Sequence, residues 1–170
     1  MFTIGHSTRT IEELTDILLS FEIKTLADIR SFPKSLTNPQ FNTNVIGKSL
    51  GEHQIQYVWL QKLGGRRKGF GTQSKNTCWR NKSFRNYADY METETFREGI
   101  DELIHLAGKS TVAIMCAESL YWRCHRSMIS DHLKSIGVQV THLIDEKNVR
   151  DHEYTQCARI IDGKLTYHEG

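Results

Sequence analysis

The sequence predicts an α/β fold in which a mainly parallel, doubly wound (Rossmann-like) sheet is flanked by helices. Segments with strand character alternate along the chain with segments of helical periodicity. The segment Thr111–Met115 is apolar throughout, as expected of a parallel strand that helices cover on both faces. The 170 residues contain no repeat or linker and match the size of one domain, about 100–200 residues. We therefore expect residues 1–170 to form a single domain.

The first part of the chain reads as strand, helix and strand. Phe2–Gly5 is a short predicted strand, and apolar residues at helical spacing predict a helix over Thr10–Phe21 with Ser7 as its N-cap. Lys24–Ile29 is the second predicted strand. It leads into residues 31–39, which contain both prolines of the chain and therefore cannot continue as a helix.

The middle of the chain leaves this alternation for a basic loop. Val45–Glu52 is predicted as a short helix and Gln54–Leu60 as the third strand. Residues 64–85 are rich in turn-forming and basic residues, and we expect them to form a loop insertion. Helical spacing begins again within it at Ser83 and runs to Met91, and a further helix is predicted over Thr95–Ala107.

The last part of the chain returns to helix and strand. After the buried strand, a helix is predicted from Arg126 or Ser127 to Ile136, with Gly137 ending it. Val138–Ile144 is the next predicted strand. Residues 158–168 contain Asp162-Gly163 between two strand-like segments, which predicts a β-hairpin with a type I′ turn.

Composition excludes several classes of protein. The formal net charge is only +2 and 38% of the residues are hydrophobic, so the chain has neither a nucleic-acid-binding tail nor a polybasic membrane-binding segment. No apolar stretch approaches the length of about 20 residues that spans a membrane, and the first residues do not resemble a signal peptide. We expect a soluble cytoplasmic protein with no membrane partner.

The four cysteines are expected to be free thiols, because no secretory signal accompanies them. A structural zinc site is not favoured, because paired short spacings are absent. Only Cys124 and His125 are close in sequence, and we expect adjacent side chains at a helix start to point in different directions.

Polar side chains follow each predicted parallel strand, where ligands bind in such sheets. The groups at the five strand ends are His6, Asp28 with Arg30, residues 63–66, Cys116 with Glu118, and Asp145. The sequence therefore predicts a site at one edge of the sheet.

The segment 115–127 predicts an anion-binding site. It lies between the buried strand and a helix start, where unpaired N–H groups and a partial positive charge favour anions. Arg123, His125 and Arg126 add side-chain donors there. The alternative is that these are ordinary surface residues.

Cys116 has three interpretations. It can be a small core residue, a nucleophile whose thiolate is favoured by nearby arginine and the helix start, or one half of a redox pair with Cys124. The order of strand, cysteine, loop, arginine and helix is similar to the phosphate-binding loop of cysteine phosphatases and rhodaneses, but Arg123 and Arg126 lie further from Cys116 than those loops require.

Glu118, Asp28 and His6 are the candidates for proton transfer. A carboxylate among arginines stays ionised and can orient a water molecule, and histidine titrates near neutrality. The alternatives are a structural Asp28–Arg30 ion pair and a packed or capping His6.

The basic loop carries a second candidate surface. No Asp or Glu occurs from Arg66 to Arg85, and Trp79 and Phe84 lie among its cations. Such a mixture is found in proteins that bind single-stranded nucleic acid. The alternative is a solvated basic loop.

Several motifs together resemble the family named domain of unknown function 488 (DUF488), over residues 3 to about 145. They are Thr3-Ile4-Gly5-His6-Ser7, Asp28-Ile29-Arg30 with Pro33 and Ser35, Asn38-Pro39-Gln40-Phe41, Leu63-Gly64-Gly65-Arg66, Tyr87-Ala88-Asp89-Tyr90-Met91, Cys116-Ala117-Glu118 and Cys124-His125-Arg126. The resemblance implies a small cytosolic protein but no settled reaction. It also implies that the matched polar residues form one site, namely His6, Asp28, Arg30, Ser35, Arg66, Glu118, Cys124, His125 and Arg126.

From these observations we expect a hydrolase-like enzyme that acts on a phosphate-bearing substrate, either a nucleotide or a nucleic acid. The expected catalytic groups are His6, Asp28, Glu118, His125 and Cys116, and the expected anion-binding groups are Arg30, Ser35, Arg66, Arg123, Cys124 and Arg126. No cofactor is predicted, although Asp28, Glu118 and His125 could hold a divalent metal. The alternatives are a thiol-dependent enzyme or redox sensor, and a non-catalytic anion-binding module.

Overall fold

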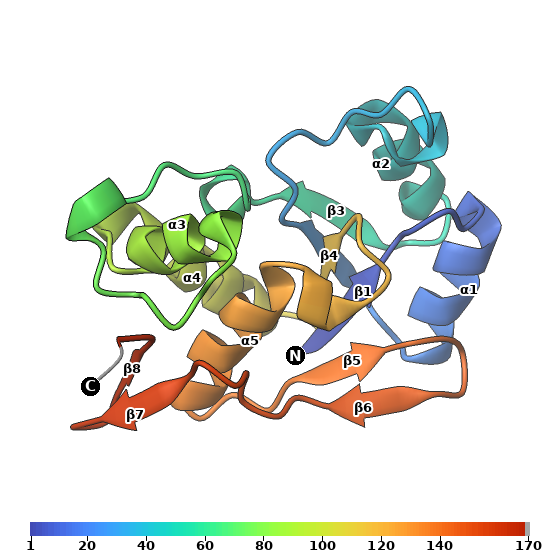
Figure 1. Cartoon of the computed structure of the whole chain (residues 1–170). Helices are drawn as coiled ribbons and strands as arrows, with labels where there is room; N and C mark the ends of the chain where they lie inside the picture. Colours follow the sequence, from blue (N-terminus) through green and yellow to red (C-terminus); the bar gives the residue numbers. More distant parts are fainter. Residues whose placement is uncertain (169–170) are drawn as a thin grey trace.

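A six-stranded sheet lies at the centre of the protein, as the computed structural model of residues 1–168 shows (Figure 1). Its strands are β1 (Phe2–Gly5), β2 (Thr25–Asp28), β3 (Gln56–Trp59), β4 (Val112–Cys116), β5 (Thr141–Leu143) and β6 (Val149–Asp151). The spatial order is β3-β2-β4-β1-β5-β6, and all neighbours are parallel except β6, which pairs antiparallel with β5. The predicted α/β fold with a mainly parallel sheet is confirmed.

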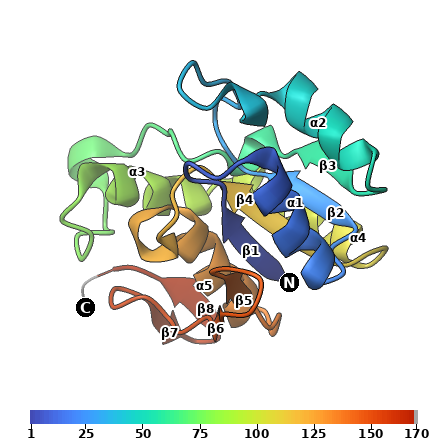
Figure 2. The ribbon, with the colours of Figure 1, turned by 90° about the vertical axis from the view of Figure 1, so that its right-hand side faces the viewer.

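Helices cover both faces of this sheet. They are α1 (Ile11–Ser20), α2 (Thr43–Gly51), α3 (Lys82–Met91), α4 (Glu94–Ala107) and α5 (Arg126–Ser135). Helices α1 and α2 pack on one face, and α3, α4 and α5 pack on the other (Figures 1 and 2). The sheet is therefore doubly wound.

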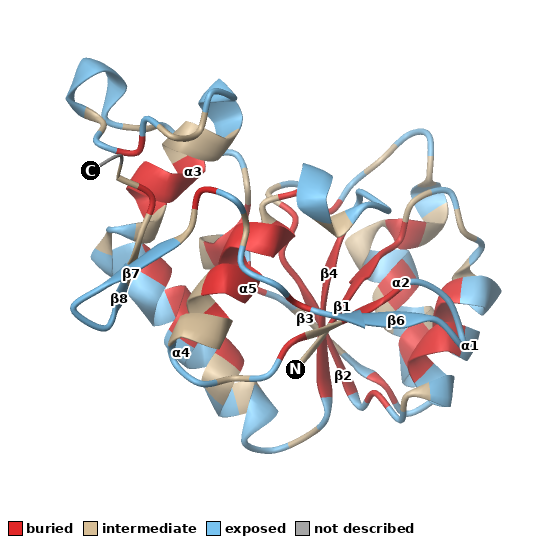
Figure 3. Ribbon diagram, turned by 60° about the horizontal axis from the view of Figure 1, so that its bottom comes forward, coloured by how far each residue is buried: buried red, intermediate tan, exposed pale blue. Residues whose placement is uncertain are grey.

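Alternation along β4 explains why two hydrophobic cores form. Val112, Ile114 and Cys116 face the core under α3–α5, while Ala113 and Met115 face the core under α1 and α2. All five are buried (Figure 3). A continuous apolar run is what a strand covered on both faces requires.

The strand order creates a crevice between β2 and β4. From β2 the chain proceeds outward to β3, whereas from β4 it crosses β1 to reach β5. The loops after these two neighbouring strands therefore diverge at their carboxyl ends. Such a switch in direction is where open α/β sheets bind ligands.

Helix α1 begins differently from the prediction. Its N-cap is Thr10 and not Ser7, because Thr10 and Glu13 form a capping box: the Glu13 N–H donates to Thr10 Oγ1 (3.1 Å) and the Thr10 N–H donates to the Glu13 carboxylate (2.7 Å). Ser7 adopts a left-handed conformation (φ 49°), and its N–H donates to the carbonyl of Ala117.

Strand β6 was not predicted from the sequence. Its three residues are all exposed, so they show no alternation of apolar and polar side chains. The turn before it is held by Asp145, which accepts hydrogen bonds from Lys147 and Asn148. Asp145 is therefore a turn residue.

The predicted C-terminal hairpin is present as β7 (Arg159–Ile161) and β8 (Lys164–Thr166), a separate two-stranded sheet. Asp162 and Gly163 both have positive φ (50° and 74°), as a type I′ turn requires. Among residues 1–168 no helix is both long and apolar enough to cross a bilayer.

The expectation of four free thiols is wrong for two of them. Cys78, in the basic loop, forms a disulfide with Cys157, near the hairpin, across 79 positions of sequence. Only the folded chain brings these segments together, so their spacing gave no sign of it. Cys116 and Cys124 are free and buried.

The basic loop of residues 64–85 is ordered by one buried carboxylate. Asp89 on α3 accepts hydrogen bonds from the backbone N–H of Phe70, from Ser74 Oγ and from Asn76 Nδ2. The loop is therefore attached to α3, and this attachment helps to place its two ends beside the crevice.

Candidate functional site

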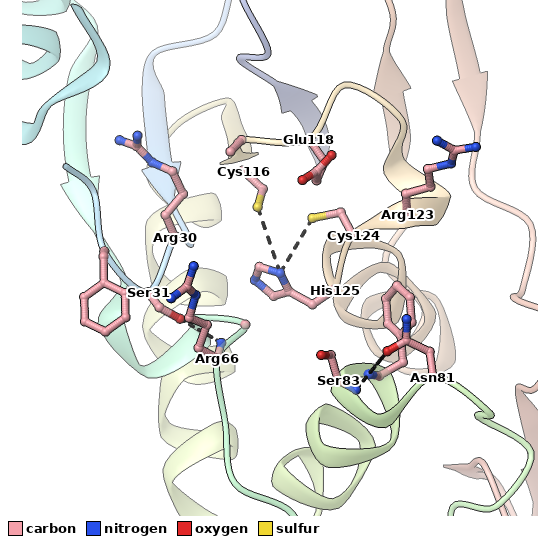
Figure 4. Close-up of a pocket in the computed structure, with 14 residues that line it drawn as sticks. Arg30, Ser31, Arg66, Asn81, Ser83, Cys116, Glu118, Arg123, Cys124 and His125 are labelled. Carbon is pink, nitrogen blue, oxygen red and sulfur yellow. Dashed lines mark hydrogen bonds between the residues drawn. The ribbon is translucent and has the colours of Figure 1, made fainter. Parts of the chain in front are cut away.

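A pocket of about 440 Å³ opens at the carboxyl ends of β2 and β4 (Figure 4). Its position agrees with the crevice that the strand order creates. The lining residues come from the loop after β2, the basic loop, the loop after β4 and the start of α5. They are Arg30, Ser31, Phe32, Gly65, Arg66, Asn81, Ser83, Phe84, Cys116, Ala117, Glu118, Arg123, Cys124 and His125. We call this the strand-end pocket.

Two thiols and an imidazole converge within the strand-end pocket. Nδ1 of His125 lies 3.6 Å from Sγ of Cys124 and 4.0 Å from Sγ of Cys116 (Figure 4). On its other side, Nε2 of His125 lies 3.1 Å from the carbonyl oxygen of Ile29. A carbonyl only accepts hydrogen bonds, so Nε2 carries the proton and the lone pair of Nδ1 faces the sulfurs.

The expectation that Cys124 and His125 point in different directions is wrong. Cys124 is extended (φ −134°, ψ 146°), whereas His125 is already helical (φ −54°, ψ −15°) at the N-cap of α5. Because the two residues are not related by the helical rotation, their side chains can approach the same point. Cys116 reaches that point from the end of β4.

The two thiols differ in their tendency to ionise. The hydrogen bond with Cys124 and burial raise the pKa of Cys116. Burial opposes ionisation of Cys124 as well, but the hydrogen bond from Cys116 and the positive charge of Arg126 lower the pKa of Cys124. The backbone N–H of Arg126 also donates to Cys124 Sγ (3.4 Å). Cys124 is therefore the thiol better suited to carry negative charge.

Arg126 lies outside the lining of the pocket. Its side chain is buried, and Nη2 donates to the carbonyls of Glu118 (2.8 Å) and Ser119 (3.3 Å). It therefore holds the backbone of the loop after β4. Its Nε is buried without a hydrogen-bond partner, and no carboxylate of residues 1–168 pairs with this guanidinium.

A second network lies behind the pocket and orients Arg30. Nε of Arg30 donates to Oδ1 of Asp28 (2.9 Å) and Nη2 donates to Oδ2 (2.6 Å), while Nη1 lies 3.3 Å from Nε2 of His6. Tyr57 donates its hydroxyl to the same carboxylate (2.6 Å). Asp28 is fully buried and does not line the pocket. These contacts agree with the alternative interpretation, in which Asp28 and Arg30 form a structural ion pair.

His6 also lies in this second network. Its ring stacks on Phe41, Nδ1 donates to the carbonyl of Ser7 (2.8 Å), and burial lowers the pKa of His6 to about 4. At neutral pH it is thus an uncharged ring that accepts a hydrogen bond from Arg30. These contacts agree with the alternative interpretation of His6 as a packed histidine.

The rim of the strand-end pocket carries three exposed charges. Arg66 and Arg123 stand on two sides of it, and Glu118 extends toward the thiols (Figure 4). Arg66 lies over the ring of Phe32, 5.6 Å from its centroid. Within residues 1–168 no ion pair involves any of these three charges.

Ser35 is not brought to the pocket. Its hydroxyl accepts a hydrogen bond from the Asn38 N–H (3.0 Å), and its own N–H donates to the Asn42 side chain (2.6 Å). Ser35 therefore helps to shape the loop of residues 31–39, which contains both prolines.

The lining includes residues that the sequence analysis did not single out. Ser31 and Phe32 directly follow Arg30, and Asn81 and Ser83 come from the end of the basic loop and the start of α3. Phe84, which the sequence analysis named for the basic loop, lines the pocket as well. The Asn81 side chain caps α3 by accepting from Ser83 N–H (2.8 Å). This cap motif was visible in the sequence, but its position in the lining of the strand-end pocket depends on the tertiary structure.

The proposed metal ligands Asp28, Glu118 and His125 do not come together. Asp28 accepts hydrogen bonds from Arg30 and Tyr57 behind the pocket. Among residues 1–168, the metal-ligating side chains that gather are Cys116, Cys124 and His125, whose ligand atoms all lie within 4.8 Å of one another.

One family model matches the chain, over residues 10–133, and its description is "Domain of unknown function DUF488". The match includes all the lining residues of the strand-end pocket but leaves His6 outside. No curated protein and no solved structure matches the chain.

Proposed function

The chain belongs to the DUF488 family, and from the strand-end pocket we propose that it is a hydrolytic enzyme acting on a small phosphate-bearing substrate. The observation that carries the proposal is a pair of arginines, Arg66 and Arg123, on the rim of one pocket without carboxylate partners among residues 1–168. Between them lie a carboxylate, an imidazole and two thiols.

The balance of charge supports an anionic substrate. The buried carboxylate of Asp28 neutralises Arg30, so Arg66 and Arg123 against Glu118 leave an excess of positive charge at the rim. Guanidinium groups form charge-assisted hydrogen bonds with phosphate oxygens in a matching planar geometry. A phosphate between these arginines would supply the anion that they lack.

The size of the pocket and the packing of the basic loop support a small substrate over a nucleic acid. A volume of about 440 Å³ lies within the usual range for small-molecule sites. Trp79, which the sequence suggested as a stacking residue, packs against Phe84 and Tyr167, with ring centroids 5.1 and 5.6 Å apart. Its ring is thus partly buried against other aromatic side chains and does not stand free to stack on a base.

The groups needed for hydrolysis are present in the pocket. Glu118 is exposed and two residues from Cys116, where it can accept a proton from an attacking water. The arginines can stabilise charge that develops on the phosphoryl oxygens. The proton taken by Glu118 can pass to the leaving oxygen after the phosphorus–oxygen bond breaks.

The experiment measures binding of inorganic phosphate and a panel of nucleoside phosphates by calorimetry, and their hydrolysis by phosphate release. We expect Arg66→Ala and Arg123→Ala each to weaken phosphate binding by about 10-fold or more, the worth of one charge-assisted hydrogen bond. Arg150→Ala, an exposed arginine on β6, is the matched control and should bind as wild type. Glu118→Gln should keep binding and lose hydrolysis.

Three outcomes would contradict this function. Phosphate binding that is absent, or unchanged in both pocket variants, would remove the anion site. Hydrolysis that survives Glu118→Gln would remove the assigned base. Tighter binding of a single-stranded oligonucleotide than of any nucleotide, lost in Arg66→Ala, would replace the small substrate by a nucleic acid.

A thiol-dependent enzyme is the second candidate, favoured by the N–H of Arg126 that donates to Cys124 Sγ at the start of α5. It requires that iodoacetamide alkylate Cys124 at neutral pH and that phosphate protect it. Thiols that stay unmodified in the metal-free protein would exclude this candidate.

A further inference from the structure

The side chains of Cys116, Cys124 and His125 have the chemistry of a soft-metal site. Cys116 ends β4, and the other two lie just before α5, so the two ends of one connecting loop supply the three ligand atoms. Thiolate sulfur and imidazole nitrogen are the ligands that Zn²⁺ prefers in proteins. The spacing of these residues in sequence does not reveal the set, because eight positions separate the two cysteines.

The two sulfur–nitrogen distances fit one tetrahedral ion. With Zn–S of about 2.3 Å and Zn–N of about 2.0–2.1 Å, tetrahedral angles place sulfur and nitrogen about 3.6 Å apart. The observed separations from His125 Nδ1 are 3.6 Å to Cys124 Sγ and 4.0 Å to Cys116 Sγ. Binding an ion would therefore need changes of only tenths of an ångström in these two sulfur–nitrogen distances.

The hydrogen bond of His125 prepares its ring for a metal. The Ile29 carbonyl accepts from Nε2 (3.1 Å), which leaves the lone pair of Nδ1 directed at the sulfurs. A backbone carbonyl on the far nitrogen is the usual outer contact of a metal-binding histidine, because it fixes the tautomer and the ring orientation.

The charge around the site supports thiolates independently of these distances. Arg126 is 1% exposed, its guanidinium bonds only carbonyls, and its Nε has no hydrogen-bond partner. A buried cation without a counter-ion is costly. A thiolate at Cys124 would place negative charge beside it, since Cys124 Sγ already accepts the Arg126 N–H. Two thiolates also cancel the two charges of a zinc ion, so the bound ion would add no net positive charge beside the guanidinium.

We propose that Cys116, Cys124 and His125 bind Zn²⁺ with the fourth coordination position open to the strand-end pocket. Three protein ligands and one open position distinguish a catalytic zinc site from a structural one. The proposal that the ion binds is argued from the geometry of these three side chains and does not depend on the proposed function.

The role of the ion rests on the proposed function. A zinc-bound water loses a proton to Glu118, and the resulting hydroxide forms the new bond to phosphorus. The bridging phosphorus–oxygen bond breaks, and the leaving oxygen takes up the proton from Glu118. No electron is transferred, so the step needs no co-reactant other than water.

The test is metal content and spectroscopy of the full-length chain, handled under nitrogen. After reconstitution with Zn²⁺ and desalting, we expect about one zinc per chain. Co²⁺ in its place should give an intense thiolate-to-cobalt charge-transfer band. Cys116→Ser, Cys124→Ser and His125→Ala should each lower the zinc affinity by more than about 100-fold, since loss of an outer contact alone costs about 10–100-fold. His53→Ala, an exposed histidine beyond α2, is the control and should bind zinc as wild type.

A measurement on the unaltered protein covers the case in which a variant fails to fold. Zn²⁺ should protect Cys116 and Cys124 from iodoacetamide. No retained zinc, no charge-transfer band and equal alkylation with and without Zn²⁺ would overturn the proposal.

The metal site and the proposed function can fail separately. Phosphate binding that depends on Arg66 in a protein that retains no zinc would leave the anion pocket and remove the metal. Stoichiometric zinc without phosphate binding would leave the metal site and remove the phosphate-bearing substrate.

Discussion

Replacing Asp28 by asparagine tests the network that orients Arg30. The carboxylate accepts hydrogen bonds from Arg30 Nε and Nη2, from the Arg30 backbone N–H and from the Tyr57 hydroxyl. Asp28 is fully buried and Arg30 is 6% exposed. Asparagine keeps the size of the side chain but removes the charge that balances the guanidinium.

The expected cost is large because the remaining partner stays buried. Breaking a buried ion pair by removing one charge costs about 3–5 kcal/mol. In Asp28→Asn, the amide oxygen can still accept from Arg30 Nε, but no carboxylate balances the guanidinium, whose other partners are the Phe41 carbonyl (2.7 Å) and His6 (3.3 Å). We expect the free energy of unfolding to fall by about 3 kcal/mol or more.

The assay is equilibrium unfolding in urea, followed by circular dichroism. Glu94→Gln is the control, because it breaks an ion pair with Arg97 in which both side chains are more than half exposed. Such pairs contribute little, so the control should stay within about 0.5 kcal/mol of wild type. A loss below about 1 kcal/mol in Asp28→Asn would show that the pair is not what holds Arg30, and would refute the reasoning.

Three further changes test other parts of the molecule. Cys78→Ser should lower the free energy of unfolding by about 4 kcal/mol, because the bond to Cys157 closes a long loop of the unfolded chain; equal urea midpoints with and without reductant would contradict this. Gly65→Ala should lower the melting temperature, because its Cβ would lie 2.5 Å from His125 Nδ1 and overpacking costs about 1–3 kcal/mol; an unchanged melting curve would mean that the ring moves freely. Because burial lowers the pKa of His6 to about 4 while the unfolded side chain titrates near 6.5, the unfolded state takes up the proton first as pH falls. Stability should therefore drop between about pH 6.5 and 4, by about 3 kcal/mol at most from His6, and urea midpoints of His6→Gln should show a shallower slope there than wild type.

The order of the elements was predictable because it depends on local patterns. The apolar run of β4, the periodicity of α1 and the Asp162-Gly163 turn each act over a few residues, and each predicted element is present. Where a pattern was weak the prediction failed, as for the exposed strand β6. The N-cap of α1 was misplaced because Ser7 and Thr10 are both good capping residues. The capping-box spacing of Thr10 and Glu13 in the sequence favours Thr10, and the reciprocal bonds with Glu13 establish it.

The candidate site was predictable in outline, because parallel strands place their carboxyl ends at one edge of a sheet. Arg30, Cys116, Glu118 and His125 do line one pocket there. Asp28 and His6 follow the same rule in sequence, yet they face the interior and orient Arg30. Strand ends fix which edge a residue occupies, and neighbouring side chains decide which way it faces.

The sequence by itself determined the helices, the strands and the edge of the sheet at which polar groups gather. These follow from hydrophobic periodicity and backbone preferences, which are properties of short segments. The tertiary structure alone decided that Cys78 meets Cys157 and that Cys116, Cys124 and His125 point at one another. The physical reason is that Cys78 and Cys157 lie on segments that only the packing of the whole chain brings together. The thiols and the imidazole lie at the two ends of the loop between β4 and α5, and the direction in which each side chain points is set by packing that no local pattern encodes.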